Sequence, residues 1–101
     1  MNSLATQQSE ARATSVRVTD DALIVDLNDG RTVLAPLAWY PRLLHGTALE
    51  QNDHQLIGEG VGINWPQLDE DISIEGILAG RRSYESKESF EQWLASRPRA
   101  T

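Results

Sequence analysis

The densest group of potentially reactive side chains in this sequence is a run of carboxylates. Asp69, Glu70 and Asp71 are consecutive, and Glu75 follows shortly after them. In an extended strand Asp69 and Asp71 lie on one side and Glu70 on the other, so two carboxylates can approach a divalent ion. The alternating oxygen ligands and central glycine of an EF-hand loop are missing. The simplest interpretation is a solvated loop beside a helix N-terminus, and among the functional interpretations we favour an acidic contact surface for a basic partner.

Other residue patterns that carry chemistry in proteins are incomplete here. The chain has no cysteine, which removes thiolate ligands, cysteine nucleophiles and disulfides. Its two histidines, His45 and His54, lack the paired spacing of a zinc site. Gly58, Gly60 and Gly62 match neither phosphate-binding motif and favour a structural loop. No serine lies in a nucleophile elbow. The sequence therefore predicts no catalytic residue, no cofactor and no metal ligand.

Two adjacent aromatic residues are candidates for a binding anchor. Trp39 and Tyr40 precede Pro41, and large aromatic side chains contribute much of the binding energy at protein interfaces. The alternative is burial, the ordinary position of such side chains in a small domain. We expect Trp65 in the core. Trp39 and Tyr40 remain candidate partner contacts.

The formal net charge of −6 is unevenly distributed. Residues 1–80 carry twelve acidic side chains against four arginines, whereas residues 81–101 carry five basic side chains against three acidic ones. An acidic body repels a phosphate backbone, which makes nucleic acid the less favoured partner. We expect a small basic protein as the partner. The alternative is a DNA-associated regulator that uses its C-terminal arginines, Arg81, Arg82, Arg97 and Arg99.

Alternating apolar residues predict a β-meander at the start of the domain. Residues 15–19 alternate between apolar and polar side chains, residues 22–27 continue with apolar side chains at 23, 25 and 27 on one face, and residues 31–35 form a returning strand. Between the last two segments, Asp29 and Gly30 supply the positive φ angles of a tight hairpin turn. We therefore predict a small antiparallel sheet of three strands.

Short elements are predicted in the second half of the chain. Thr47 and Glu50 have the spacing of a capping box, which begins a helix over residues 48–55. Residues 72–74 alternate as an edge strand does, and a short helix is expected over residues 75–79.

The C-terminal part of the chain predicts one longer amphipathic helix. Phe90, Trp93 and Leu94 share one face of a helix over residues 87–96, and Ser86 is its expected N-cap. These apolar groups have two interpretations, which the sequence leaves open. The helix docks on the rest of the domain, or it binds in the groove of a partner.

The chain length suits one domain. Its 101 residues predict a single α+β domain over residues 15–96, with flexible tails at 1–14 and 97–101. No segment approaches the roughly 18 consecutive apolar residues of a membrane span, and the first residues lack the apolar core of a signal peptide. We expect a cytoplasmic protein that has no membrane contact.

Several segments of this sequence resemble the bacterial DUF2442 family. The segments are VTDDAL at 18–23, DGRT at 29–32, PLAWYPRL at 36–43 and GVGINWPQLDEDI at 60–72, and the resemblance covers about residues 16–80. It implies a small α+β fold without an assigned activity. It also implies a gene often adjacent to that of a small DUF4160 protein, in an arrangement similar to toxin–antitoxin pairs. A cognate protein partner is therefore expected.

Three hypotheses follow for the function. The first is a non-catalytic protein-binding module, antitoxin-like, which uses its carboxylates and Trp39 with Tyr40. The second is the DNA-associated regulator. The third and weakest is a divalent-metal-dependent enzyme at Asp69 and Asp71. Edge strands in so small a sheet are also compatible with a homo-oligomer, and the sequence leaves the oligomeric state open.

Overall fold

The computed structural model describes residues 10–98. Most of the two expected tails therefore lies outside the described residues. Two boundaries of the expected domain are wrong. The first strand begins at Ala13, which is buried against the core, two residues before the expected start. Arg97 was expected in a tail, but its guanidinium forms an ion pair with Glu50.

The predicted α+β class and the predicted meander are confirmed. Strands β1 (Ala13–Val18), β2 (Ala22–Leu27) and β3 (Thr32–Pro36) form an antiparallel sheet in the order β1-β2-β3. The turn between β2 and β3 contains Gly30, whose φ of 95° suits the residue without a side chain. Alternate residues of β2 point into the core because successive strand residues face opposite sides of a sheet: Leu23, Val25 and Leu27.

A second antiparallel sheet is formed by three short strands in the order β4-β5-β6. These are β4 (Gln55–Ile57), β5 (Gly62–Trp65) and β6 (Glu70–Ser73), and the 3-10 turn η2 (Gly58–Gly60) joins the first two. Strand β4 was not expected, because the preceding helix was predicted to continue to residue 55. Leu56 and its neighbours instead pair with β5.

Short helical elements surround the sheets. Besides η2, they are η1 (Leu37–Trp39), α2 (Pro41–Leu44), α3 (Ala48–Asn52), α4 (Ile74–Leu78) and α5 (Lys87–Ser96). Helix α4 begins one residue earlier than expected, and the last predicted residue of the expected edge strand is part of it. The position of α5 agrees with the prediction, because its bounds are those expected from the sequence.

Side-chain caps explain where these helices begin. The predicted capping box is present in α3, where the Thr47 hydroxyl accepts from the Glu50 N–H and the Glu50 carboxylate accepts from the Thr47 N–H. Ser73 and Ser86 accept N–H groups at the starts of α4 and α5. Each cap replaces a hydrogen bond that the first turn of a helix lacks.

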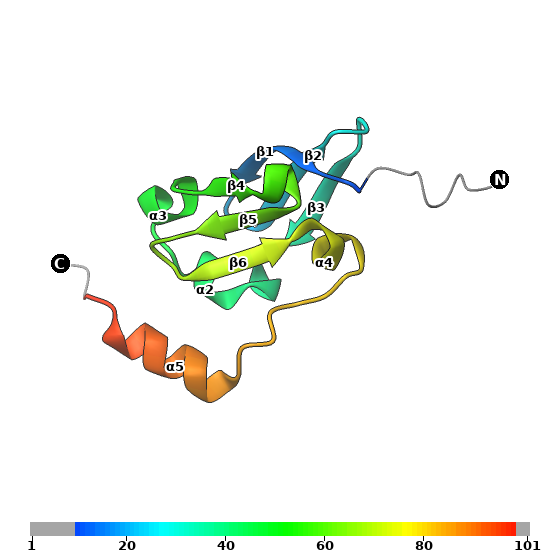
Figure 1. Ribbon diagram of the computed structural model, residues 1–101. Helices are drawn as coiled ribbons and strands as arrows, with labels where there is room; N and C mark the ends of the chain where they lie inside the picture. Colours follow the sequence, from blue (N-terminus) through cyan, green and yellow to red (C-terminus); the bar gives the residue numbers. More distant parts are fainter. Residues whose placement is uncertain (1–9, 99–101) are drawn as a thin grey trace.

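The core lies where the inner faces of the two sheets meet. In Figure 1 the sheet β4-β5-β6 crosses in front of β1-β2-β3, and one continuous apolar cluster includes buried residues of both sheets. Trp65 and Ile63 of β5 and Leu43 of α2 have no exposed surface. The expected burial of Trp65 is therefore confirmed.

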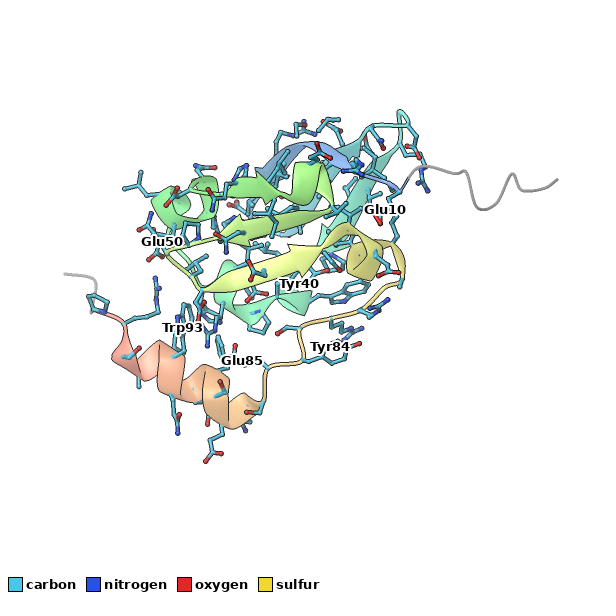
Figure 2. The ribbon with its side chains drawn as sticks, in the orientation of Figure 1. Glu10, Tyr40, Glu50, Tyr84, Glu85 and Trp93 are labelled. Carbon is cyan, nitrogen blue, oxygen red and sulfur yellow. The ribbon has the colours of Figure 1, made fainter. Side chains whose placement is uncertain are left out.

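Helix α5 is docked through a tryptophan between two arginines. The Trp93 ring lies 5.1 Å from the guanidinium of Arg42 and 4.7 Å from that of Arg97. Each arginine also binds a carboxylate at 2.6 Å, Arg42 that of Glu85 and Arg97 that of Glu50. Figure 2 shows Trp93 directed from α5 toward the domain. These contacts decide between the two interpretations in favour of docking in this structure.

Candidate functional site

The expected pair of carboxylates does not form. Asp69 lies in the turn before β6 with a φ of 50°, and its side chain is 97% exposed, 3.7 Å from Arg42. Asp71 lies on β6 and accepts a hydrogen bond from the side-chain amide of Asn64 at 2.6 Å. The prediction that the two aspartates share one side of an extended strand is wrong, because the strand begins only at Glu70. Within residues 10–98, no group of three or more histidine, aspartate or glutamate side chains is arranged to hold a metal ion.

Glu70 has the most perturbed carboxyl group of the site. Its side chain is half-buried on β6, and burial raises its pKa to about 7 although the positive charge of Arg42 opposes this change. The nearby carboxylates of Glu85, Asp71 and Asp69 add to the rise. Within the described part of the chain, no hydrogen bond reaches the Glu70 carboxylate, so this half-buried acceptor has no donor there.

The structure separates the two candidate aromatic contacts. Tyr40 is 3% exposed, and its hydroxyl donates to the main-chain carbonyl of Arg81 at 3.4 Å. Its role as an exposed anchor is therefore a wrong prediction, because the ring fills the space beneath the segment after α4. Burial also raises the pKa of Tyr40. Trp39 is half-buried, and the guanidinium of Arg82 lies 5.1 Å from its ring.

The C-terminal arginines do not form one patch. Arg81 and Arg82 lie in the segment that follows α4, and Arg82 stacks on Trp39. Arg97 lies beyond α5 and is occupied by Glu50 and Trp93. Arg99 lies outside the described residues. Of the described C-terminal arginines, Arg82 and Arg97 therefore already have partners within the domain.

A shallow apolar groove crosses the second sheet beside α4. It comprises two adjoining hollows with volumes of about 640 and 450 Å³, which share Val61 and Ser73. Ile57 and Leu78 are each about 40% exposed there. We call this surface the apolar groove, and its lining residues are Glu10, Ala11, Ile57, Gly58, Val61, Gly62, Asp71, Ile72, Ser73, Glu75, Leu78 and Ala79.

The charges along the apolar groove have one sign. Glu10, Asp71 and Glu75 line it, and none of its described lining residues is lysine or arginine. Two of the predicted acidic contacts, Asp71 and Glu75, thus lie in a common surface, whereas Asp69 does not line it. The apolar members of the groove were not predicted from the sequence, because Ile57 and Leu78 lie in separate short elements that only the fold brings together.

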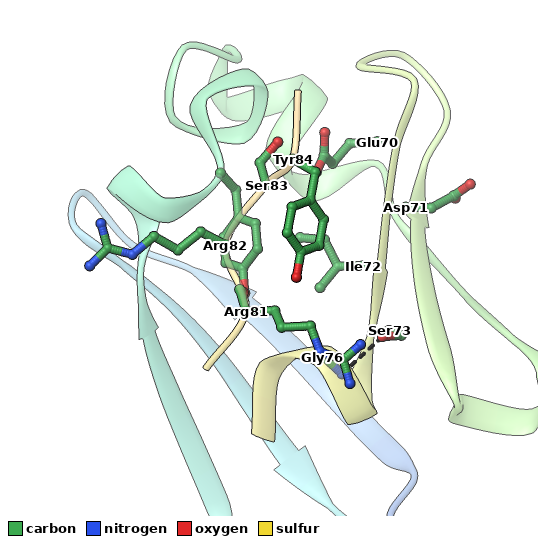
Figure 3. A pocket seen from close by; sticks show the side chains of 10 residues that line it. Glu70, Asp71, Ile72, Ser73, Gly76, Arg81, Arg82, Ser83 and Tyr84 are labelled. Carbon is green, nitrogen blue, oxygen red and sulfur yellow. Dashed lines mark hydrogen bonds between the residues drawn. The ribbon is translucent and has the colours of Figure 1, made fainter. Parts of the chain in front are cut away.

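A second hollow lies between β6 and the segment that follows α4. Its volume is about 230 Å³, and we call it the slot. Residues 70–73 form one wall and residues 81–84 the other, with Tyr40 and Gly76 completing the lining. Figure 3 shows Glu70 near one end and the Arg81 side chain reaching toward Gly76 near the other.

The fold and these surfaces define a small α+β domain of two three-stranded sheets within the described residues. A family model for DUF2442, described as a protein of unknown function, matches residues 13–83. The chain therefore belongs to the DUF2442 family, as its resemblance predicted. Helix α5 follows the matched region.

Solved structures of related proteins share this fold. A protein of unknown function from Rhodospirillum rubrum is 28% identical, with a TM-score of 0.65 over 81% of this chain and 99% of that one. The uncharacterized protein CV0863 from Chromobacterium violaceum is 24% identical, with a TM-score of 0.62 over 84% of this chain and 79% of that one. No curated protein matches the sequence. Within residues 10–98, no helix has the length and apolar character needed to cross a membrane.

Proposed function

We propose that this protein is a protein-binding module whose apolar groove receives an apolar, lysine- or arginine-bearing segment of a partner protein. The observation that carries the proposal is the combination of exposed apolar side chains with an acidic rim. Ile57 and Leu78 are each about 40% exposed. Glu10, Asp71 and Glu75 lie beside them.

The apolar part of the groove supplies favourable free energy of binding. Removing apolar surface from water contributes about 25 cal/mol for each Å² buried. The larger hollow, at about 640 Å³, lies within the range of about 300–1,000 Å³ in which proteins receive ligand groups. An aliphatic or aromatic side chain of a partner fits between Val61 and Leu78 and covers both.

The acidic rim favours a partner segment of positive charge. Carboxylates at the edge of an interface attract basic side chains, speed association and disfavour acidic competitors. Because the rim is exposed, its contribution decreases as salt screens it over the Debye length of about 10 Å at 0.1 M. A basic partner with an apolar anchor therefore suits this surface better than a nucleic acid, whose phosphates the rim repels.

The proposal also assigns the protein an antitoxin-like place in a two-gene pair. A chain that covers a basic partner with an acidic, partly apolar surface has the physical properties that such a role needs. The support for a paired gene is the family resemblance, which implies a small protein encoded nearby. The partner is then a single small basic protein that forms a stoichiometric complex.

The test uses the purified pair. A tagged form of the protein recovers candidate partners from its source cells, and calorimetry with each purified candidate then measures the affinity. Leu78→Asp places a charge in the groove, and we expect the affinity to fall by at least about tenfold. Leu34→Asp, at a position that is 63% exposed on β3, is the matched control and leaves the affinity unchanged.

Charge reversal separates the rim from the apolar contact. The double variant Asp71→Lys, Glu75→Lys is expected to weaken binding and to remove most of its salt dependence. An affinity that is independent of salt contradicts the acidic-rim part of the proposal. Equal affinities of the Leu78→Asp and Leu34→Asp variants contradict the groove itself.

A further inference from the structure

The slot lies at the edge of a strand. Successive strand residues face opposite sides of a sheet, so a hollow on one face is lined by every second residue. The slot is lined by all four residues of β6, Glu70, Asp71, Ile72 and Ser73. It therefore opens onto the edge of β6, where the backbone groups lie. Figure 1 shows the segment that follows α4 on the side of β6 away from β5.

The register of β6 identifies which backbone groups face this edge. Ile74 donates its N–H to the carbonyl of Val61, and the pairing then continues through Ile63↔Ile72 and Trp65↔Glu70 as the hydrogen-bonded pairs. The N–H groups of Asp71 and Ser73 and the carbonyl of Asp71 consequently point away from β5. Among the described residues, β6 is an edge strand of its sheet.

The opposite wall of the slot is held in place. The Ser83 N–H donates to the carbonyl of Trp39 at 3.0 Å, and the Arg82 guanidinium stacks on the Trp39 ring. The Tyr84 ring, which is 84% exposed, projects between the two walls in Figure 3. The edge of β6 thus faces, across the slot, a segment that is tied to Trp39, and the Tyr84 ring lines the slot together with Ile72.

Glu70 is the one half-buried carboxylate of the slot, and its neighbours are already engaged. Arg42 directs three hydrogen bonds to Glu85 and a fourth to the carbonyl of Leu68. The Tyr40 hydroxyl donates to Arg81 and not to Glu70. Within residues 10–98, no ion pair joins Glu70 to an arginine. This end of the slot therefore holds a half-buried carboxylate that has no partner among the described residues.

We infer that the slot binds an extended peptide segment of the partner, which adds to the free edge of β6 and places a lysine or arginine side chain against Glu70. Strand addition uses main-chain hydrogen bonds for affinity and side-chain pockets for specificity. Here the backbone groups of Asp71 and Ser73 at the free edge supply the main-chain hydrogen bonds, and the Glu70 carboxylate supplies the specificity. This inference rests on the proposed protein-binding function.

The size of the slot fits this ligand. Its volume of about 230 Å³ is below the range of about 300–1,000 Å³ typical of pockets that enclose a small molecule. A strand lying along β6 needs only a shallow hollow, because most of its contacts are with the edge. An exposed strand edge can pair with many other strands. At β6 the slot restricts this pairing to a segment that fits between its two walls.

The test uses short peptides and needs no identified partner. Acetylated and amidated Val-Lys-Val is titrated into the full-length, isotope-labelled protein, and the same peptide with norleucine for lysine is the matched probe. We expect the lysine peptide to shift the amide signals of Asp71 and Ser73 and to bind at least about fivefold more tightly than the norleucine peptide. In Glu70→Gln this preference disappears, whereas in Glu91→Gln, at an exposed carboxylate of α5, it persists.

Proton release gives a second, independent measurement. A cation beside Glu70 stabilises its ionised form and lowers its pKa, so binding near pH 7 releases protons. Calorimetry of the lysine peptide in buffers with different ionisation enthalpies measures this release, and Glu70→Gln abolishes it. The other charged groups that face Glu70, namely Arg42, Glu85, Asp69 and Asp71, together with the Tyr40 phenol, are present in both proteins.

The outcomes separate this inference from the proposed function. Equal binding of the lysine and norleucine peptides, or shifts that leave Asp71 and Ser73 unmoved, overturn the assignment of the slot. In Leu78→Asp, which alters only the apolar groove, the lysine peptide is expected to bind as in the wild type. If Leu78→Asp loses partner binding but still binds the lysine peptide, the loss is due to the apolar groove and the assignment of the slot stands.

Discussion

Trp65 is the largest fully buried side chain of the core. Its ring has no exposed surface, and its indole N–H donates to the carbonyl of Gln51 at 2.9 Å. Trp65→Ala leaves a cavity and removes this hydrogen bond, so we expect the free energy of unfolding to fall by about 3–5 kcal/mol. Urea denaturation measures the change. Leu49→Ala, at a position 82% exposed, is the control and is expected to stay within about 0.5 kcal/mol of the wild type.

Glu70 makes stability depend on pH in an unusual direction for a carboxylate. Its pKa is about 7 in the folded protein, against an ordinary value of 4.5, so the folded state binds more protons than the unfolded chain between these values. The stabilising contribution of the protonated side chain is complete below about pH 4.5 and is lost as the pH rises through about 7. We expect the free energy of unfolding to decrease between about pH 5 and pH 8, as measured by urea denaturation.

The Glu70→Gln variant isolates this effect. Glutamine does not titrate, so the variant is expected to gain stability relative to the wild type as the pH rises. The contributions of the other titrating groups cancel in the difference between the two free energies of unfolding. Glu50 and Glu85, whose pKa values are lowered mainly by hydrogen bonds from Arg97 and Arg42, stay ionised in this range. A constant difference between variant and wild type across the range contradicts the assignment.

Single residues were predictable where one local property decides their position. Trp65 alternates with Ile63 in an apolar strand, and this pattern is sufficient to predict burial. Tyr40 lies in a short helical connection without such a pattern. Its burial depends on the segment around Arg81, which is distant in sequence, and was therefore not predicted.

Among the local elements, two turns with glycine at positive φ allow a matched comparison. At Gly30, with a φ of 95°, an added Cβ would meet open space, whereas at Gly60, with a φ of 98°, it would lie 2.6 Å from the carbonyl oxygen of Ala13. Gly30→Ala therefore costs only the backbone strain, about 1–2 kcal/mol. Gly60→Ala is expected to cost at least about 1 kcal/mol more because η2 has to move away from β1. Equal losses in thermal or urea denaturation contradict this packing of η2.

Helix α5 depends on the contact of Trp93 with two guanidinium groups. Removing the ring in Trp93→Ala eliminates both stacking contacts, each of about 0.5–2 kcal/mol. We expect the amide hydrogens of α5 to exchange at least about tenfold faster, while those of β2 and β5 are unchanged. Gln92→Ala, on the exposed side of the helix, is the control. Unchanged exchange in the Trp93→Ala variant shows that the docking has another basis.

The elements illustrate what local sequence signals determine. The hairpin at Gly30 and the capping box of Thr47 and Glu50 were predicted because each depends on residues within one turn. Strand β4 was missed because its three residues form no strand alone and gain their hydrogen bonds from β5. The docking of α5 was left open for the same reason, since its partners Arg42 and Glu50 are more than 40 residues away.

At the scale of the whole molecule, the packing of two small sheets creates the surfaces that the function needs. The sequence predicted an acidic contact but assigned it to consecutive residues. The fold distributes these carboxylates, so that Asp71 and Glu75 border the apolar groove and Glu70 enters the slot. The apolar members of the groove come from β4, β6, α4, the residue after η2 and the segment before β1, which no short sequence pattern connects.

The most direct test of the account is site-specific crosslinking in the source cells. A photoreactive phenylalanine analogue replaces Leu78 in the apolar groove or, as the control, Leu34 on β3, both of which are exposed. If the apolar groove is the binding surface, position 78 gives a covalent adduct with one small basic protein and position 34 gives none of that adduct. The same adduct from both positions, or an adduct only from position 34, would contradict the claim that the groove is the binding surface.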